Sequence, residues 1–479
     1  MSTAAPKSSL LQRAGVKTPQ ERAKTNPVKF ALILTQLALL LVVVKLYGVE
    51  EHSTMFYRLT LACVLGFVVH YFTPFTYKKH AFLAVSVLGA AFVLWPDDPR
   101  KAPIDKAINV ASVLGVTGIL SLVFYGVLRL PIKFIARVAI LVGIGAALYL
   151  ARRDGMILPN VLGFKDAEGN ILPGELFPST YWAIVGSIFM FRLALYAFEV
   201  RVAKKPEKLI DYLSYMLVLP NFYFAFIFPV IDYSTFKKSH YAEDIHVVAQ
   251  RGVLWISRGI VQLLLLNVVR HHFQVAGTEV HDFWSLWQFM IGAYLMYLRV
   301  SGQFHMIVGM LLLFGYSLPE THRRYYLAHS FTDFWRRINI YWKDYMVKLI
   351  FYPVYFRLRK KNEKAALVIG TVCVFVATTV LHSYQFFWVR GSFKLTQTDL
   401  MFWGVLGGVV IVNMLWEQRP GAKKKKPTEQ KGPAFWAVRS LQVVAMFLTM
   451  SVLWSMWTTP ELLVWIDTVR AGLGGGGKP

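Results

Sequence analysis

The sequence predicts an all-α polytopic membrane protein, and three observations lead to this fold class. Of the 479 residues, 56% are hydrophobic and 16% are charged. The mean hydropathy of +0.45 lies outside the usual range of soluble proteins. Apolar stretches long enough to cross the ~30 Å hydrocarbon core of a bilayer recur along nearly the whole chain. Because backbone groups in lipid must be hydrogen-bonded within the protein, we expect these stretches to be helices.

The predicted elements follow one another with mostly short loops between them. Stretches with the length of a full span lie at 30–48, 56–73, 132–150, 179–198, 252–269, 365–389 and 434–456. Shorter candidates lie at 81–95, 107–128, 209–231, 281–298, 303–317 and 399–416. Together they give roughly a dozen transmembrane helices. No soluble domain is expected.

The net charge of +25 does not indicate nucleic-acid binding, because the basic residues lie in short loops rather than on one folded face. Their placement follows the positive-inside rule. The segment 1–29 is basic and lacks both an apolar core and a small-residue cleavage site, so we expect a cytoplasmic tail rather than a signal peptide. On this topology the basic loops around 78–79, 204–208 and 423–426 are cytoplasmic, and the long polar segment 152–178 is extracytoplasmic.

One ionisable residue, His382, lies well inside the apolar run 365–391. An imidazole is costly to place in hydrocarbon, and it can exchange a proton near neutral pH. It can serve as a general base, or it can hydrogen-bond to a neighbouring helix and hold the two together. The sequence leaves both interpretations open.

The segment 329–345 is too polar to span a membrane and unusually aromatic for a loop. At helical spacing, Phe331, Trp335, Ile338 and Trp342 form one apolar stripe. The simpler interpretation is an amphipathic helix at the membrane surface. The alternative is a re-entrant element that packs into the protein and lines a polar cavity.

A third unusual segment, 212–236, carries two prolines inside an apolar run that ends at Asp232 and Tyr233. Proline removes a backbone donor, so we expect this segment to be kinked or interrupted. Elsewhere, no group of His, Cys and carboxylate residues has the spacing of metal ligands, and no GxSxG motif occurs. The sequence therefore disfavours metal and serine-nucleophile chemistry.

These segments together resemble the membrane-bound O-acyltransferase family. FWRRINIYWKDY (334–345) is similar to the bacterial pattern FWRRWHxSLSxWxRDY and keeps Phe334, Trp335, Arg336, Arg337, Trp342, Asp344 and Tyr345. Asn339 stands where many bacterial members have His, and resembles the Asn of many eukaryotic members. LHSYQFFWVRG resembles the second signature, a His late in the following helix, with His382 kept and Ser383 in place of the usual Gly.

The upstream segment resembles the family's proline-rich motif, with Pro220, Pro229, Tyr233 and Phe236 kept and Phe228 in place of its Gly. The resemblance covers about residues 210–395. Within the family, the sequence most resembles bacterial members of the alginate O-acetylase and D-alanyl-transfer type. The segments before residue 210 match the family in hydropathy alone.

The resemblance implies a membrane-embedded core with a central tunnel and re-entrant helices. It divides the chain into a basic tail (1–29), N-terminal transmembrane helices (30–200), a catalytic core (201–395), C-terminal transmembrane helices (396–470) and a flexible tail (471–479). It implies that His382 is the general base and that Asn339 bonds the substrate carbonyl or orients the substrate. The substrate-binding residues it implies are His329, Asp333, Trp335, Arg336, Arg337, Trp342, Lys343, Tyr345 and Tyr233.

The implied reaction is acyl transfer, with an acetyl group favoured, from acyl-CoA or an acyl-carrier thioester on the cytoplasmic side to a hydroxyl group. No tightly bound cofactor, metal or nucleic acid is expected. We expect the acceptor to be an extracytoplasmic polysaccharide or cell-envelope polymer at a bacterial inner membrane, with an extracytoplasmic acyltransferase as a possible partner. Lipid O-acylation is the second expectation. An inactive scaffold or a transporter of the same fold are the rivals from other classes.

Overall fold

The computed structural model describes residues 17–153, 179–201, 207–225, 231–419 and 432–474. Over these residues the protein is helical and has no β-strand. In this part of the chain, 11 helices are long and apolar enough to cross a membrane. The protein is therefore an all-α polytopic membrane protein, as its hydropathy predicted.

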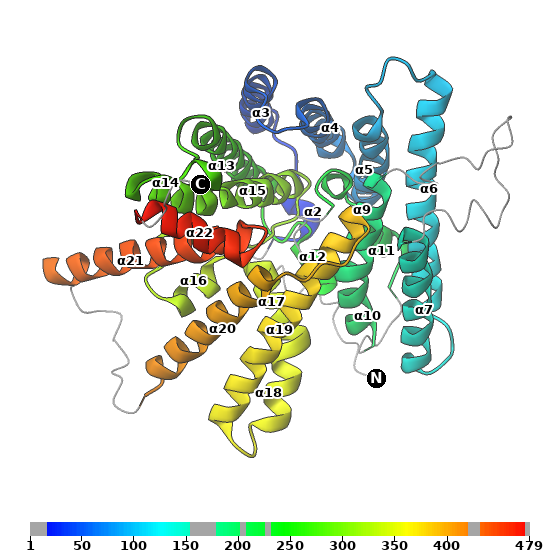
Figure 1. Ribbon diagram of the computed structural model, residues 1–479. Helices are drawn as coiled ribbons and strands as arrows, with labels where there is room; N and C mark the ends of the chain where they lie inside the picture. The colour runs from blue at the N-terminus through cyan, green and yellow to red at the C-terminus, as the bar shows by residue number, and fades with distance from the viewer. Residues whose placement is uncertain (1–16, 154–178, 202–206, 226–230, 420–431, 475–479) are drawn as a thin grey trace, which may run out of the picture. The chain divides into compact units, whose positions relative to one another are not determined.

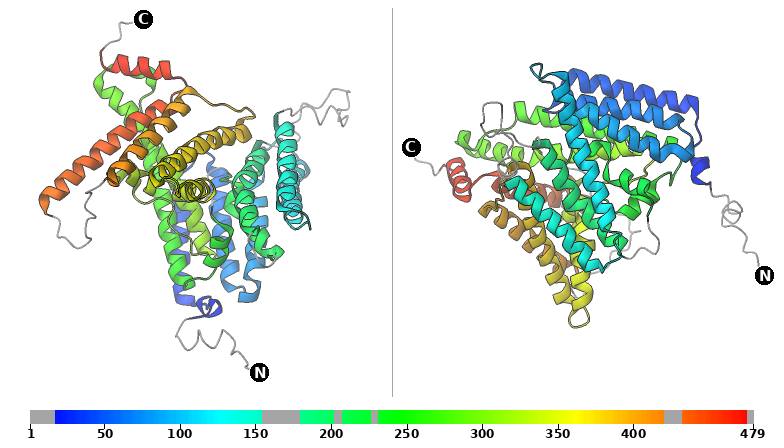
Figure 2. Two further views of the ribbon diagram at one scale, coloured as in Figure 1. Left: turned by 90° about the horizontal axis from the view of Figure 1, so that it is seen from below. Right: turned by 90° about the vertical axis from the view of Figure 1, so that its right-hand side faces the viewer.

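The chain forms two compact units, each built from several segments. Unit 1 comprises residues 1–261, 303–319 and 388–391. Its helices are α2 (Pro19–Arg22), α3 (Pro27–Tyr47), α4 (Ser53–Phe72), α5 (Lys78–Leu94), α6 (Pro103–Val127), α7 (Phe134–Arg153), α9 (Ser179–Ser187), α10 (Ala194–Val200), α11 (Leu209–Met216), α12 (Tyr233–Ser239) and the first half of α13 (Ile245–His272). Helices α3, α4 and α5 lie side by side, in blue in Figure 2.

Unit 2 comprises residues 262–302, 320–387 and 392–479. Besides the second half of α13 it contains α14 (Phe283–Leu295), the start of α15 (Tyr297–Leu313), α16 (Phe331–Arg337), α17 (Ile340–Met346), α18 (Tyr352–Leu358), α19 (Glu363–Arg390), α20 (Gln397–Glu417), α21 (Pro433–Thr458) and α22 (Leu462–Gly472). In Figure 1, α18 and α19 form an antiparallel pair, and α21 runs along α14 and α22.

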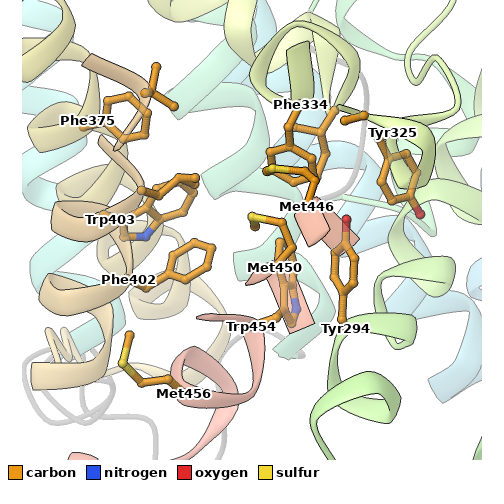
Figure 3. Close-up of a cluster of buried hydrophobic side chains, with 14 residues drawn as sticks. Tyr294, Tyr325, Phe334, Phe375, Phe402, Trp403, Met446, Met450, Trp454 and Met456 are labelled. Atoms are coloured by element: carbon orange, nitrogen blue, oxygen red, sulfur yellow. The ribbon is translucent and has the colours of Figure 1, made fainter. Parts of the chain in front are cut away.

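Aromatic and methionine side chains fill the core of unit 2 (Figure 3). Phe402 and Trp403 of α20 face Met450 and Trp454 of α21, and Tyr294 of α14 contacts Trp454 with ring centroids 5.4 Å apart. Burying one such ring contributes about 1.5–3 kcal/mol. This cluster fixes the helices that carry the candidate site described below.

The structure modifies one predicted span. The candidate at 209–231 is not one continuous helix, because α11 ends at Met216 and a 3₁₀ turn, Leu219–Phe222, follows. Pro220 lies in that turn, so the predicted interruption is found where a proline predicts it. Other sequence predictions concern residues outside the described ranges, namely 1–16, 154–178, 204–206, Phe228, Pro229, 423–426 and 475–479.

Candidate functional site

His382 lies on α19, and three tryptophan rings surround its imidazole. Trp403 of α20 stacks on it with ring centroids 5.0 Å apart. Trp457 of α21 presents its ring at 88° to the imidazole at 5.9 Å, and Trp342 of α17 lies at 5.6 Å. The imidazole is partly buried. The three indoles come from three different helices, so the orientation of the imidazole depends on the packing of unit 2.

The imidazole nitrogens of His382 make no hydrogen bond within the described part of the chain. Asp399 is close enough to interact with the imidazole electrostatically. Its own oxygens are bonded elsewhere, one by the Trp457 indole N–H at 2.8 Å and the other by the backbone N–H and the hydroxyl of Thr396. A proton donor that enters this site can therefore bond to the imidazole without displacing a bond to any described residue.

The segment 329–345 forms two short helices, and not one continuous amphipathic helix along its apolar stripe. Helix α16 ends at Arg337, and α17 begins at Ile340. Asn339 lies between them with φ +35°, a left-handed conformation that Asn tolerates better than most residues. The Oδ1 atom of Asn339 accepts a bond from the backbone N–H of Trp342 at 3.3 Å and so caps α17.

Backbone hydrogen bonds hold this break in place. The N–H of Ile340 donates to the carbonyl of Thr321, and the N–H of Arg323 donates to the carbonyl of Arg337. The Phe334 and Tyr341 side chains are buried. The segment is therefore packed into unit 2 and does not lie as a separate helix on its surface.

Trp342 connects the two sequence signatures. Its indole N–H donates to the Thr378 hydroxyl at 3.3 Å, one turn before His382 on α19, and its ring contacts the imidazole. Tyr345 stacks beside it with ring centroids 5.7 Å apart. Asn339 caps the helix that carries Trp342, so it acts on the His382 site through that indole.

His329, which precedes α16, forms one ionic cluster with Asp333 and Arg337 of α16. The Asp333 carboxylate accepts from the guanidinium of Arg337 at 2.8 Å and lies 3.2 Å from Nε2 of His329. Burial lowers the pKa of His329, and the Asp333 carboxylate opposes that shift. The Asp333 carboxylate and the Arg337 guanidinium therefore neutralise each other, and such a pair suits a structural role.

The other predicted binding residues have varied surroundings. Trp335 packs against Phe375 of α19 with ring centroids 4.8 Å apart. Arg336 lies 3.8 Å from Glu417 with a side chain 67% exposed, and Lys343 lies 2.8 Å from the adjacent Asp344.

Tyr233 belongs to unit 1. Its hydroxyl donates to Glu207 at 3.1 Å, and Glu207 also pairs with Lys237. Burial and the Glu207 carboxylate raise the pKa of Tyr233. The residue is buried and neutral in this setting, and its surroundings are those of a structural hydrogen bond.

A groove of about 330 Å³ lies between α19 and α20 in unit 2. Its lining is mainly apolar and includes Phe375, Val376 and Gly404. Trp403 belongs to the same lining, and this is the ring that stacks on His382. An apolar part of a substrate thus has a place beside the histidine.

Sequence reasoning did not identify Trp403, Trp457 or Asp399. A local signal existed for Asp399, since Thr396 and Asp399 form a capping box at the start of α20. Tryptophans in apolar spans carry no such signal. No group of three or more His, Cys, Asp and Glu residues that could hold a metal ion occurs among the described residues.

No protein-family model matches the chain, and a comparison with functionally characterised proteins finds no match. The resemblance to the membrane-bound O-acyltransferases therefore remains a prediction that depends on the motifs quoted above.

Proposed function

We propose that the protein is a membrane-embedded O-acyltransferase of the membrane-bound O-acyltransferase type. It moves an acyl group, with acetyl favoured, from a thioester donor to a hydroxyl group. One observation supports this most: the His382 imidazole is held by three indoles, and the described residues leave its nitrogens open to a substrate.

In the proposed reaction, a neutral His382 accepts the proton of the acceptor hydroxyl while the hydroxyl oxygen attacks the thioester carbonyl carbon. The tetrahedral intermediate then collapses, the C–S bond breaks, and the imidazolium returns the proton to the departing thiolate. Atoms and charge balance without a covalent enzyme intermediate. A general base of this kind contributes about 10²- to 10⁴-fold in rate. The surrounding indoles limit the access of water, which would otherwise hydrolyse the donor.

Trp342 and Asn339 are assigned positioning roles. Trp342 holds one side of the imidazole and is anchored to α19 through Thr378. Asn339 sets the break that directs α17 toward α19. Its Nδ2 atom makes no bond within the described ranges, so the expectation that it donates to a carbonyl oxygen also stays a prediction.

The cations of the segment are assigned to the donor. Arg336 is mostly exposed, and its distance of 3.8 Å to Glu417 makes that pair weak. With Lys343 it can bind the phosphates of coenzyme A or of a carrier's phosphopantetheine on the cytoplasmic side. Arg337 is already engaged by Asp333 and is assigned a structural role.

A polysaccharide or cell-envelope polymer is the proposed acceptor, at a bacterial inner membrane and with an extracytoplasmic acyltransferase as a partner, because the FWRR segment resembles bacterial polymer acylators. Lipid O-acylation is the second candidate. The apolar groove lined by Trp403 favours it, since that groove offers room for a hydrocarbon chain near His382.

The test uses the full chain in lipid vesicles, radiolabelled acetyl-CoA or palmitoyl-CoA, and membrane extracts as acceptors. Label that enters the glycan fraction supports the first acceptor class, and label that enters the lipid fraction supports the second. A His382→Ala variant is assayed beside the wild type. Transfer at the wild-type rate by this variant would refute the assigned site, and no transfer by either protein would favour a scaffold or a transporter.

A further inference from the structure

A second groove, in unit 1, lies between the first turns of α3 and α13. Its volume is about 570 Å³, within the range of small-molecule sites. Its lining residues from α3 are Lys29, Leu32 and Ile33, and those from α13 are His246, Val247, Gln250, Arg251 and Leu254. Both helices are long and apolar enough to cross a membrane. None of these residues belongs to the proposed reaction.

The groove is open along its apolar side. Leu32 is 61% exposed, Val247 is 54% exposed and Leu254 is 49% exposed. Such side chains on membrane-spanning helices face hydrocarbon when the protein is in a bilayer. A molecule from the membrane can therefore enter the groove sideways, without passing through the protein.

The polar lining is basic or neutral. Lys29 lies in the first turn of α3, and Arg251 lies within the first two turns of α13. Carboxylates near these cations, Glu243 and Asp244, do not line the groove. Glu243 instead fixes the guanidinium of Arg251 through bonds of 2.7 and 3.0 Å.

Arg251 keeps donors for a further partner. It makes three bonds among the described residues, two to Glu243 and one of 3.4 Å to Ser317, whereas a guanidinium has five N–H groups. A guanidinium that is already oriented loses little freedom when it binds an anion, and phosphate oxygens suit its planar donors.

A pair of amides spans the two helices beside Arg251. Gln36 and Gln250 exchange hydrogen bonds of 3.2 and 2.8 Å. Gln36 lies seven residues after Lys29, which is about 10 Å along a helix. Lys29 thus lies toward the start of the groove, Arg251 directly follows Gln250 of the amide pair, and the apolar side chains face outward.

This combination of basic and exposed apolar groups matches the charged and apolar parts of a phospholipid. From it we infer that the groove binds one anionic phospholipid, with its phosphate between Lys29 and Arg251 and its acyl chains along Leu32 and Leu254. Basic pockets between membrane helices on the cytoplasmic side are typical sites for such headgroups. This site is independent of the proposed acyl transfer.

The test is native mass spectrometry of the full chain equilibrated with phosphatidylglycerol or with phosphatidylcholine. The wild type is expected to retain one phosphatidylglycerol and to hold phosphatidylcholine about tenfold more weakly, because the choline cation of phosphatidylcholine is repelled by Lys29 and Arg251 and offsets the charge of its phosphate. Lys29→Glu and Arg251→Gln are each expected to weaken phosphatidylglycerol binding by about tenfold or more. Lys361→Glu, at an exposed lysine between α18 and α19, is the charge-matched control and is expected to bind as the wild type does.

Leu32→Trp supplies a variant that keeps every charge. It adds bulk at an exposed position of the groove and is expected to reduce retention without lowering the thermal midpoint in the absence of lipid. The midpoint also shows whether Arg251→Gln folds. If it does not fold, Lys29→Glu and Leu32→Trp decide the result, since both change exposed residues.

Three results would overturn the inference. The first is equal retention of the two lipids by the wild type, and the second is equal retention of phosphatidylglycerol by Lys29→Glu and Lys361→Glu. The third is a rise in thermal midpoint with inorganic phosphate alone that matches the rise with phosphatidylglycerol, which would indicate a site for free phosphate.

Discussion

Asn339 offers a sharp test of how the two sequence signatures are joined. The structure gives it two local tasks, because it occupies a left-handed conformation at φ +35° and its side chain caps α17. Replacement by Ala removes the cap, at about 1 kcal/mol. It also leaves a Cβ in the left-handed region without the polar side chain that lets Asn adopt this conformation, which costs at most about 1–2 kcal/mol. The sum is at most about 2–3 kcal/mol, or about 30- to 140-fold in the local opening equilibrium of α17.

Asn339→Gly also removes the side-chain cap of α17, but it removes the Cβ as well. Glycine adopts the left-handed conformation without a steric penalty, and a glycine cap costs a few tenths of a kcal/mol. The opening of α17 should then rise by about twofold or less. Because α17 holds Trp342 against His382, acyl transfer should fall strongly in the Ala variant and little in the Gly variant.

Hydrogen exchange of the α17 amides measures the opening, and the acyl-transfer assay measures the consequence. An equal loss of transfer in both variants, with wild-type exchange in α17, would refute the positioning role. That pattern would show instead that the Asn339 amide itself contacts the substrate, a contact that contributes about 3 kcal/mol where it stabilises an oxyanion.

Three further predictions follow from particular contacts. The pKa of His329 is lowered in the folded protein, so the unfolded chain binds more protons as the pH falls through the ordinary value of 6.5, and the free energy of unfolding should fall with the pH. Thermal unfolding of the wild type at a series of pH values should show this dependence. A His329→Gln variant with the same dependence would contradict the assignment to His329. Trp342→Phe removes a hydrogen bond worth about 0.5–1.5 kcal/mol and should slow acyl transfer more than Trp335→Phe, which keeps an aromatic ring against Phe375. Equal transfer rates in the two variants would argue against the hydrogen bond from Trp342 to Thr378 as the anchor of this indole. Gly407→Ala places a Cβ 2.8 Å from Phe375 and should destabilise the folded protein by about 1–3 kcal/mol in unfolding titrations. The Cβ of Gly404→Ala on the same helix meets nothing within 4 Å, so this variant should be neutral or stabilising. Equal effects of the two variants would show that α19 and α20 pack less closely than the structure indicates.

The spans of the protein follow from hydropathy because length and apolar composition decide them locally. The predicted run 365–389 lies within α19, and 434–456 lies within α21. The cost of placing an imidazole in such a run marks His382, but it also marks His70 in 56–73 and His305 in 303–317, and the motif around His382 is what separates it from these two.

The break at Asn339 was missed because apolar residues at helical spacing continue across it. A single residue in the left-handed region ended the helix there, although Asn is both a good cap and a residue that tolerates this conformation. The preference of Asn for helix caps therefore indicated the break, but the apolar residues at helical spacing were given more weight.

The aromatic surroundings of His382 could not be predicted from the sequence. Trp403 and Trp457 approach it from two later helices, and only the packing of α19 against α20 and α21 brings these rings together. Nothing local distinguishes these tryptophans from others in apolar spans, since a contact of this kind is a property of tertiary structure.

Chemical rescue tests the role of His382 most directly. The His382→Ala variant leaves a space between three indole rings, into which free imidazole can bind as a substitute base. Single-turnover acyl transfer by this variant should be about 10²- to 10⁴-fold slower than by the wild type, and added imidazole should restore part of the rate. A variant that transfers the acyl group at the wild-type rate without imidazole would contradict the assignment of His382 as the base.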